Sequence, residues 1–110
     1  MTKLKVSSWN DGKHNQNGNG YGIRVGKKGR EFFNKNISEI KLSIEKTEFI
    51  KVRLSSGFWR NCPEFRDKRI GEWLISNNFA PWKKGKTPKF NLTILDNNEF
   101  HLERINPNNF

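Results

Sequence analysis

The sequence predicts a mainly β fold: a seven-stranded open β-barrel, or pseudobarrel, with two short helices in a single domain. Three observations support this prediction. Short runs of alternating apolar and polar residues recur along the chain, as expected for strands with one buried face. The length of 110 residues suits one domain. Only 33% of the residues are hydrophobic, but nine Phe and four Trp bury large areas each, so we expect a small core under a polar surface.

The alternating runs mark the predicted strands. The first two are residues 4–9 and 21–25, and residues 40–54 then alternate on both sides of a turn, which predicts a hairpin. A second hairpin is predicted over residues 89–105, around the turn pair Asn97-Asn98. Packing about seven short strands into one small domain favours a barrel, because closure hides strand edges that so polar a chain would otherwise expose.

Two stretches predict short helices. Residues 27–35 (KKGREFFNK) begin with charged residues and end with an aromatic pair, which indicates one or two helical turns. In residues 70–78 the apolar side chains Ile70, Trp73 and Leu74 recur at the spacing of one helix face. Helices of this length can cover the ends of a barrel without changing its class.

The remaining segments are predicted to be loops. Residues 10–20 are rich in Asn and Gly and should form a long flexible loop, and residues 79–90 form a loop rich in Pro and Lys. Residues 106–110 should be frayed. The prediction is therefore one domain over residues 1–110, of which residues 3–105 are folded.

Charge composition points to a polyanionic partner. There are 21 Lys and Arg against 11 Asp and Glu, a net charge of +10, which creates a positive field. Nucleic acid is the first candidate partner. A membrane surface is not expected, because no basic amphipathic helix is long enough. The alternative interpretation is that the charge only keeps the protein soluble. The N-terminus lacks the apolar stretch of a signal peptide, which predicts a cytoplasmic or nucleoid-associated protein.

Signals of catalysis are weak, and we expect no enzyme activity, no metal and no cofactor. The single Cys62 excludes an intramolecular disulfide and a multi-cysteine zinc site. The only histidines are His14 and His101, and the carboxylates of residues 64–72 are interleaved with Lys and Arg like an ion-paired surface. A Cys-His pair could form only in space. The sequence therefore favours a binding protein over an enzyme.

Basic residues are concentrated in the predicted loops, where one barrel end could gather them into one positive surface. These loop cations are Lys13, Lys27, Lys28, Arg60, Lys83, Lys84, Lys86 and Lys89. Residue types that read DNA bases also occur there, since Arg pairs with guanine and Asn with adenine: Asn15, Asn17, Arg24, Arg60 and Asn61. The alternative for the Asn residues is that they only form turns.

The order of elements resembles the B-three DNA-binding pseudobarrel family, found in plant transcription factors and in target-recognition domains of some restriction endonucleases. The stretch GYGIRVGKKGREFFNK looks like the family's strand leading into a short helix, and EIKLSIEKTEFIKVRLS is similar to its central hairpin. FRDKRIGEWLISNNF looks like the strand that runs into the second helix, and KFNLTILDNNEFHLERI is similar to the closing hairpin. The resemblance covers residues 4 to about 105.

The resemblance implies that two arms grip the major groove of double-stranded DNA. The first arm would be residues 12–24 and the second Ser55–Asn61. In SSGFWRN, Phe58 and Trp59 would either anchor the arm on the barrel or press on sugar and backbone. The full set of expected DNA contacts is Lys13, His14, Asn15, Asn17, Arg24, Lys27, Lys28, Ser55, Ser56, Trp59, Arg60, Asn61, Lys83, Lys84 and Lys86.

Two other functions are consistent with the sequence. The protein could be an interaction module that docks on an acidic partner protein, with the Phe58-Trp59 pair as its hot spot. It could also bind single-stranded nucleic acid or RNA by stacking exposed Trp and Phe rings on bases. Competition between duplex and single-stranded oligonucleotides separates the second alternative from duplex binding.

Overall fold

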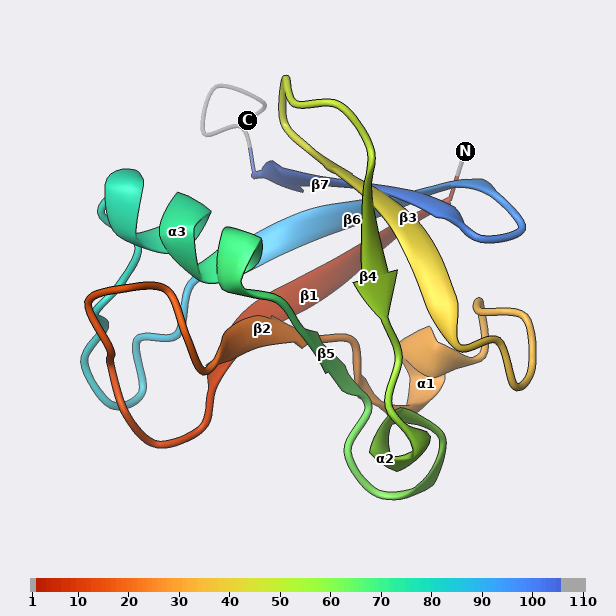
Figure 1. Cartoon of the computed structure of the whole chain (residues 1–110), viewed down its shortest axis with the longest axis horizontal. Helices are drawn as coiled ribbons and strands as arrows, with labels where there is room; N and C mark the ends of the chain where they lie inside the picture. Colours follow the sequence, from red (N-terminus) through yellow and green to blue (C-terminus); the bar gives the residue numbers. More distant parts are fainter. Residues whose placement is uncertain (1, 106–110) are drawn as a thin grey trace.

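Seven strands form one sheet that curls into a nearly closed barrel, with three short helices at its ends (Figure 1). The computed structural model describes residues 2–105. In chain order the elements are β1 (Lys3–Asn10), β2 (Tyr21–Arg24), α1 (Gly26–Arg30), β3 (Glu39–Ile44), β4 (Ile50–Arg53), α2 (Ser56–Arg60), β5 (Glu64–Arg66), α3 (Lys68–Ser76), β6 (Lys89–Asp96) and β7 (Glu99–Arg104). The predicted class, a mainly β open barrel in one domain, is confirmed.

The strand order in the sheet is β4-β3-β7-β6-β1-β2-β5. Both predicted hairpins are present, with Leu42 opposite Ile50 in β3–β4 and Leu92 opposite Leu102 in β6–β7. Neighbouring strands are antiparallel except for β3 and β7, which run parallel. This parallel pair joins the two hairpins, and β1 links the second hairpin to β2 and β5.

The barrel stays open between its edge strands β4 and β5. These strands approach each other, but no ladder pairs them. Arg69, at the start of α3, bridges part of the gap by donating a hydrogen bond from Nη2 to the carbonyl of Lys51 in β4 (2.9 Å). A groove of about 420 Å³ remains along the seam, lined in part by Arg53 and Glu64.

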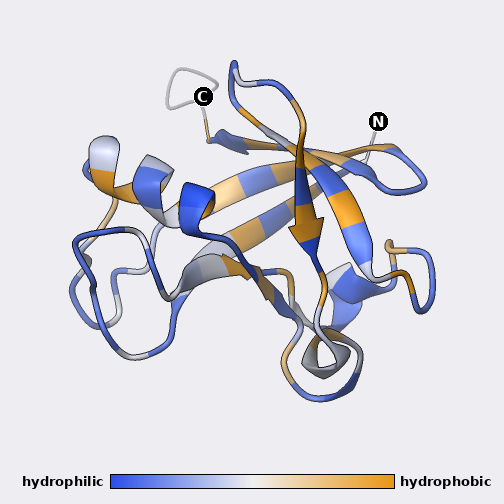
Figure 2. Ribbon diagram, in the orientation of Figure 1, coloured by the Kyte–Doolittle hydropathy of each residue, from blue (hydrophilic) through white to orange (hydrophobic). Residues whose placement is uncertain are grey.

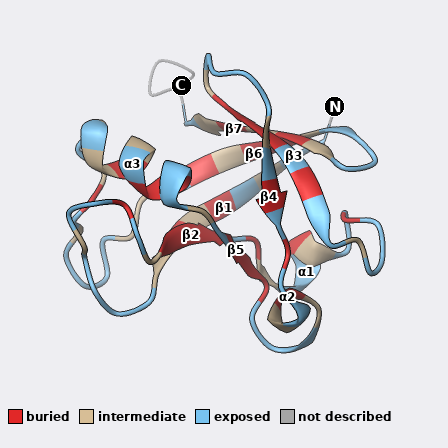
Figure 3. Cartoon of the chain, in the orientation of Figure 1, coloured by how far each residue is buried: buried red, intermediate tan, exposed pale blue. Residues whose placement is uncertain are grey.

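The core fills the inside of the barrel with the inward residues of each alternating strand. Hydropathy alternates along the strands in Figure 2, and the burial in Figure 3 follows the same pattern. Aromatic rings supply much of this core, as the composition predicts: Phe33 stacks on Phe100 at 4.4 Å and packs against Phe58 at 5.0 Å. Phe58, Phe90 and Phe100 are fully buried.

The helices differ from the prediction in length and number. Helix α1 is shorter than the predicted 27–35, and α3 begins at Lys68 because the Asp67 carboxylate caps it, accepting a hydrogen bond from the Arg69 backbone N–H (2.8 Å). A third helix, α2, lies where the sequence predicted only a loop. It turns the chain so that Phe58 enters the core.

The long loop between β1 and β2 lies against α3. Gly18 has a left-handed φ of +91°, and its carbonyl comes so close to Gly71 that a Cβ there would be 2.0 Å away. The backbone N–H of Asp11 donates to the carbonyl of Gly20 (2.9 Å) and closes the loop at its base. Glycine at positions 18 and 71 is therefore what lets the first arm pack on the helix. The predicted frayed end, residues 106–110, lies outside the described residues.

Candidate nucleic-acid interface

Charge is divided unevenly between two sides of the barrel. Residues 39–51 and 96–104 include β3, β7, the turns beside them, the start of β4 and the last residue of β6, and they hold six carboxylates and four Lys or Arg. We call this the β3–β7 side. The rest of the chain, which we call the basic side, holds seventeen Lys or Arg and five carboxylates. The excess positive charge therefore belongs entirely to the basic side.

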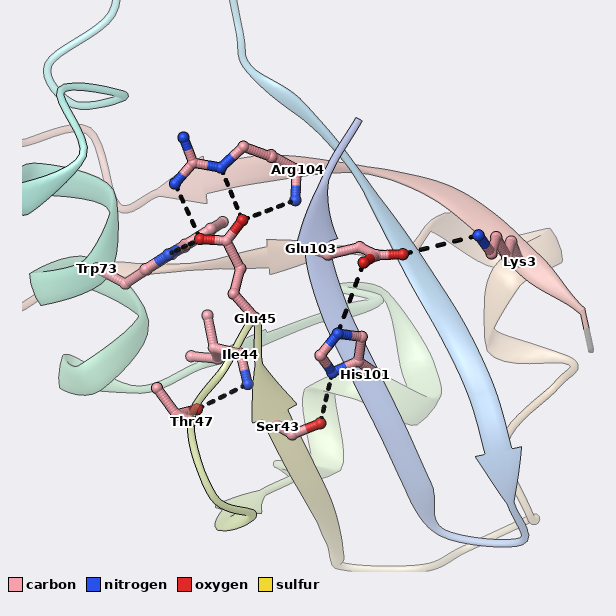
Figure 4. A network of polar contacts seen from close by, with 9 residues as sticks. All are labelled: Lys3, Ser43, Ile44, Glu45, Thr47, Trp73, His101, Glu103 and Arg104. Atoms are coloured by element: carbon pink, nitrogen blue, oxygen red, sulfur yellow. Dashed lines mark hydrogen bonds and ion pairs between the residues drawn. The ribbon is translucent and has the colours of Figure 1, made fainter. Parts of the chain in front are cut away.

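Three of the six carboxylates of the β3–β7 side are paired with cations within the fold, and Figure 4 shows two of them, Glu45 and Glu103. Glu45 receives a bidentate hydrogen bond from the Arg104 guanidinium (2.7 and 2.9 Å) and a third from the Trp73 indole N–H (3.0 Å). Glu99 pairs with Lys41 and Glu103 with Lys3. These contacts tie β3, β7, β1 and α3 together.

The Glu45 carboxylate titrates far below its ordinary range. Hydrogen bonds from Arg104 lower the pKa of Glu45 to about 2, against the opposing effect of burial. The carboxylate is therefore charged in the folded protein at almost any pH. The role of Glu45 is structural, since its carboxylate joins the β3–β4 turn to α3 and β7.

The eight cations that the sequence placed in loops have no such partners, although the structure puts Lys27 and Lys28 in α1, Arg60 in α2 and Lys89 at the start of β6. No ion pair among residues 2–105 involves Lys13, Lys27, Lys28, Arg60, Lys83, Lys84, Lys86 or Lys89. All eight side chains are exposed. A cation without a carboxylate beside it keeps its full attraction for an external anion.

Arg24 occupies the middle of the basic side, on the outer face of β2. It lies opposite Ser7 of β1 and beside Glu64 of β5, whose carboxylate is 3.6 Å from the guanidinium. On the same outer face the Arg66 guanidinium covers the Trp9 ring at 4.5 Å. Sequence reasoning missed Trp9 and Arg66. The signal was available, since Trp9 alternates with the inward Val6 and Ser8 and so points outward.

The first arm and the lysine-rich loop meet at one end of this face. The His14 ring packs edge-on against Trp82 at 4.7 Å and shares a hydrogen bond with the Tyr21 hydroxyl (3.1 Å). Burial, and next the charge of Asp11, raise the pKa of Tyr21, so that hydroxyl stays protonated. Trp82, which the sequence reasoning did not select, thus fixes the loop that carries Lys83, Lys84 and Lys86. Through these contacts His14 attaches the first arm to Trp82 and Tyr21.

A groove of about 360 Å³ connects this end to the strands. Arg24, Trp9, Trp82 and Lys89 are among the residues that line it. Two predicted base-reading residues instead hold the arm in shape: Asn15 donates to the Asn19 carbonyl (3.0 Å), and the Asn17 side-chain oxygen accepts from the Asn19 N–H (3.0 Å). Here the turn-forming interpretation of asparagine applies.

The second arm, helix α2, lies at the other end of the basic side. Ser55, Ser56, Arg60 and Asn61 are exposed, whereas Phe58 is fully buried. Of the two roles considered for the aromatic pair, Phe58 therefore anchors the arm. Helix α1 is bound to this arm, because Arg30 Nη1 donates to the carbonyls of Phe58 (3.0 Å) and Arg60 (3.3 Å).

The expected contact residues thus fall into two groups joined by Arg24. The first group lies on the first arm and on the loop of Trp82, which the His14–Trp82 contact joins: Lys13, His14, Asn15, Asn17, Lys83, Lys84 and Lys86. The second gathers around α1 and α2: Lys27, Lys28, Ser55, Ser56, Trp59, Arg60 and Asn61. Strand β2 leads from one group to the other, since it begins at the end of the β1–β2 loop and ends beside α1.

Comparisons with protein-family models, curated proteins and solved structures gave no match to this chain. The resemblance to the B-three family therefore stays a hypothesis based on the order of elements. Within residues 2–105 no helix is long and apolar enough to cross a membrane, and no cluster of three or more His, Cys, Asp or Glu could hold a metal ion.

Proposed function

We propose that this protein binds double-stranded DNA through its basic side and catalyses no reaction on it. The observation that carries the proposal is the separation of charge: Glu45, Glu99 and Glu103 of the β3–β7 side are paired with cations within the fold, whereas eight exposed cations of the basic side have no ion pair among residues 2–105. Phosphates are the anions that such a spread of exposed cations fits, because duplex DNA presents them in two regular rows.

Phosphate contacts and base contacts fall to different residues under this proposal. Lys13, Lys83, Lys84 and Lys86 at one end and Lys27 and Lys28 at the other would meet phosphates and fix the register. Base edges would be read from the middle and from α2, by Arg24, Arg60 and Asn61, whose side chains are exposed. The division agrees with the two arms that the B-three resemblance implies.

Fluorescence-anisotropy titration of a randomised duplex and of the matching single strand, over a series of salt concentrations, tests the proposal. About six phosphate contacts would weaken duplex binding by roughly three to five decades between about 50 and 200 mM salt. Tighter binding to the single strand than to the duplex would favour single-strand binding by base stacking. If neither oligonucleotide binds at low salt, duplex binding and single-strand binding are both wrong.

Single-stranded nucleic acid is the second candidate, because Trp9, Trp59 and Trp82 are only half-buried on the basic side. Aromatic rings that stack on bases are the usual basis of such binding. A role as a docking module for an acidic protein has less support. Its proposed hot spot needs both rings of the Phe58-Trp59 pair, and Phe58 is inside the core.

A further inference from the structure

An open hollow of about 560 Å³ lies between α1, the residues that follow it, and Trp59 of α2. Lys27, Lys28, Arg30, Glu31, Lys35 and Trp59 are among its lining residues. We call it the α1–α2 hollow. Sites for single small ligands have volumes of roughly 300–1,000 Å³, so the hollow is large enough for one.

Positive charge dominates this hollow. Four cations line it, Lys27, Lys28, Arg30 and Lys35, against the single carboxylate of Glu31. None of the four takes part in an ion pair within residues 2–105. Arg30 donates only to carbonyl oxygens, which orient its charge but do not neutralise it. The ligand should therefore be an anion.

Trp59 gives the hollow an aromatic wall. The indole N–H already donates to the carbonyl of Ile37 (3.0 Å), and the ring packs edge-on against the buried Phe58 at 5.1 Å. Because its only polar atom is engaged inside the fold, the part of Trp59 that faces a ligand is carbon surface. Such a surface stacks on a nucleobase regardless of the base's hydrogen-bonding pattern.

The walls are held by hydrogen bonds that do not depend on a ligand. Arg30 binds the α2 carbonyls, and the backbone N–H groups of Val25 and Gly26 donate to the carbonyl of Pro63 (2.9 and 3.3 Å). Helix α1 and the chain around α2 are therefore fixed to one another. A preformed site of this kind loses little conformational entropy on binding.

We propose that the α1–α2 hollow binds a single unstacked nucleotide, with its base against Trp59 and its phosphate among Lys27, Lys28 and Lys35. The nucleotide comes either as a free mononucleotide or as an unpaired residue at the end of a strand. This site goes beyond duplex binding, although it shares Lys27 and Lys28 with the edge of the DNA surface. Lys35 belongs to the hollow alone.

NMR titration of the full chain with the mononucleotide dAMP tests the site at low salt. The Trp59 indole signal, identified with the variant Trp59→Phe, should shift on addition of dAMP, whereas the signal of the Trp73 indole, which donates to Glu45, should not. Deoxyadenosine and inorganic phosphate should each bind at least tenfold more weakly. If inorganic phosphate binds as tightly as dAMP, or the Trp59 signal does not move, the assignment is wrong.

Two lysine variants provide a matched pair. Lys35→Glu should weaken dAMP binding at least fivefold, and Lys46→Glu, an equal change of charge in the β3–β4 turn, should leave it unaltered. Equal losses in the two variants would show a general charge effect and overturn the site. Trp59→Phe should retain more affinity than Trp59→Leu, because a phenyl ring still stacks; equal affinities would also overturn it.

The source of the nucleotide is decided by competition. A duplex with one unpaired, phosphorylated nucleotide at its end should displace dAMP better than a blunt duplex if the strand end is the ligand. Equal displacement points to the free mononucleotide. If the protein binds duplex DNA but gives no dAMP response, the nucleotide site is wrong and the DNA proposal stands. If it binds dAMP but not duplex DNA, the DNA proposal is wrong and the nucleotide site stands.

Discussion

The two sides of the barrel use charge in opposite ways. On the β3–β7 side, Glu45 accepts three hydrogen bonds from the side chains of Arg104 and Trp73, and its charge holds three elements together. On the basic side, the lysines of residues 83–89 stand exposed without an ion pair among residues 2–105. The first arrangement stabilises the fold, and the second leaves charge available to a partner. The comparison separates cations that the fold needs from cations that it does not.

The largest effect is expected when lysines are removed from the basic side. Changing Lys83, Lys84 and Lys86 together to Ala should weaken duplex binding at least a hundredfold, and the slope of log affinity against log salt should fall by about three because each phosphate contact contributes about one. The measurement is anisotropy over a salt series.

The matched control removes the same charge from the other side. Lys41, Lys46 and Lys51 changed together to Ala should leave both the affinity and the salt slope nearly unaltered. Equal losses in the two triple variants would mean that net charge alone drives binding, and the comparison between the sides would fail.

The attachment of the first arm should depend on Gly71. Gly71→Ala places a Cβ 2.0 Å from the Gly18 carbonyl, so we expect a loss of about 1–3 kcal/mol in the free energy of unfolding and displacement of the arm. Gly57→Ala is the control, because its Cβ would meet only ordinary contacts of 3.5 Å or more. Urea denaturation of both variants measures the difference; equal stabilities would contradict the close packing of arm and helix.

Arg60 should read a base if the second arm enters a groove. Arg60→Ala should weaken binding to a selected target site and relax the preference at one base pair by roughly 1–3 kcal/mol. A uniform loss over all sequences would make Arg60 a phosphate contact. Binding equal to that of the wild type would exclude it from the interface.

The smallest effect should come from Glu45. Its pKa is lowered from 4.5 in the unfolded chain to about 2, so its contribution to stability is present above the unfolded value and is lost as pH falls through the folded one. Because Glu45 and Arg104 are partly exposed, we expect Glu45→Gln to cost only about 1–2 kcal/mol at neutral pH.

Denaturation across the acid range checks this contribution. The difference in stability between wild type and Glu45→Gln should shrink from about pH 5 to pH 2. A difference that stays constant over that range would show that the carboxylate charge is not what stabilises the contact.

Local patterns in the sequence predict most of the fold. Alternation located both hairpins, and the spacing of Ile70, Trp73 and Leu74 located α3. Helix α2 was missed because five residues are too few to show a period, and the three residues of β5 show no clear alternation of their own. The parallel pairing of β3 with β7 joins residues far apart in sequence, so no local signal reports it.

The candidate site was predictable in its residue types more than in its geometry. Local sequence pattern was enough to place Lys83, Lys84 and Lys86 in a loop, but the grouping of the cations depends on contacts between distant segments. His14 meets Trp82 through the fold, and Arg30 reaches α2 in the same way. These contacts decide that the expected residues form two groups with Arg24 between them.

Mapping the bound DNA onto the chain by NMR tests the central claim most directly. We expect that titration with duplex DNA shifts the backbone amide signals of residues 10–28, 55–61 and 82–89 and leaves those of residues 39–51 and 96–104 in place. Shifts concentrated on the β3–β7 side, or spread evenly over both sides, would contradict the account.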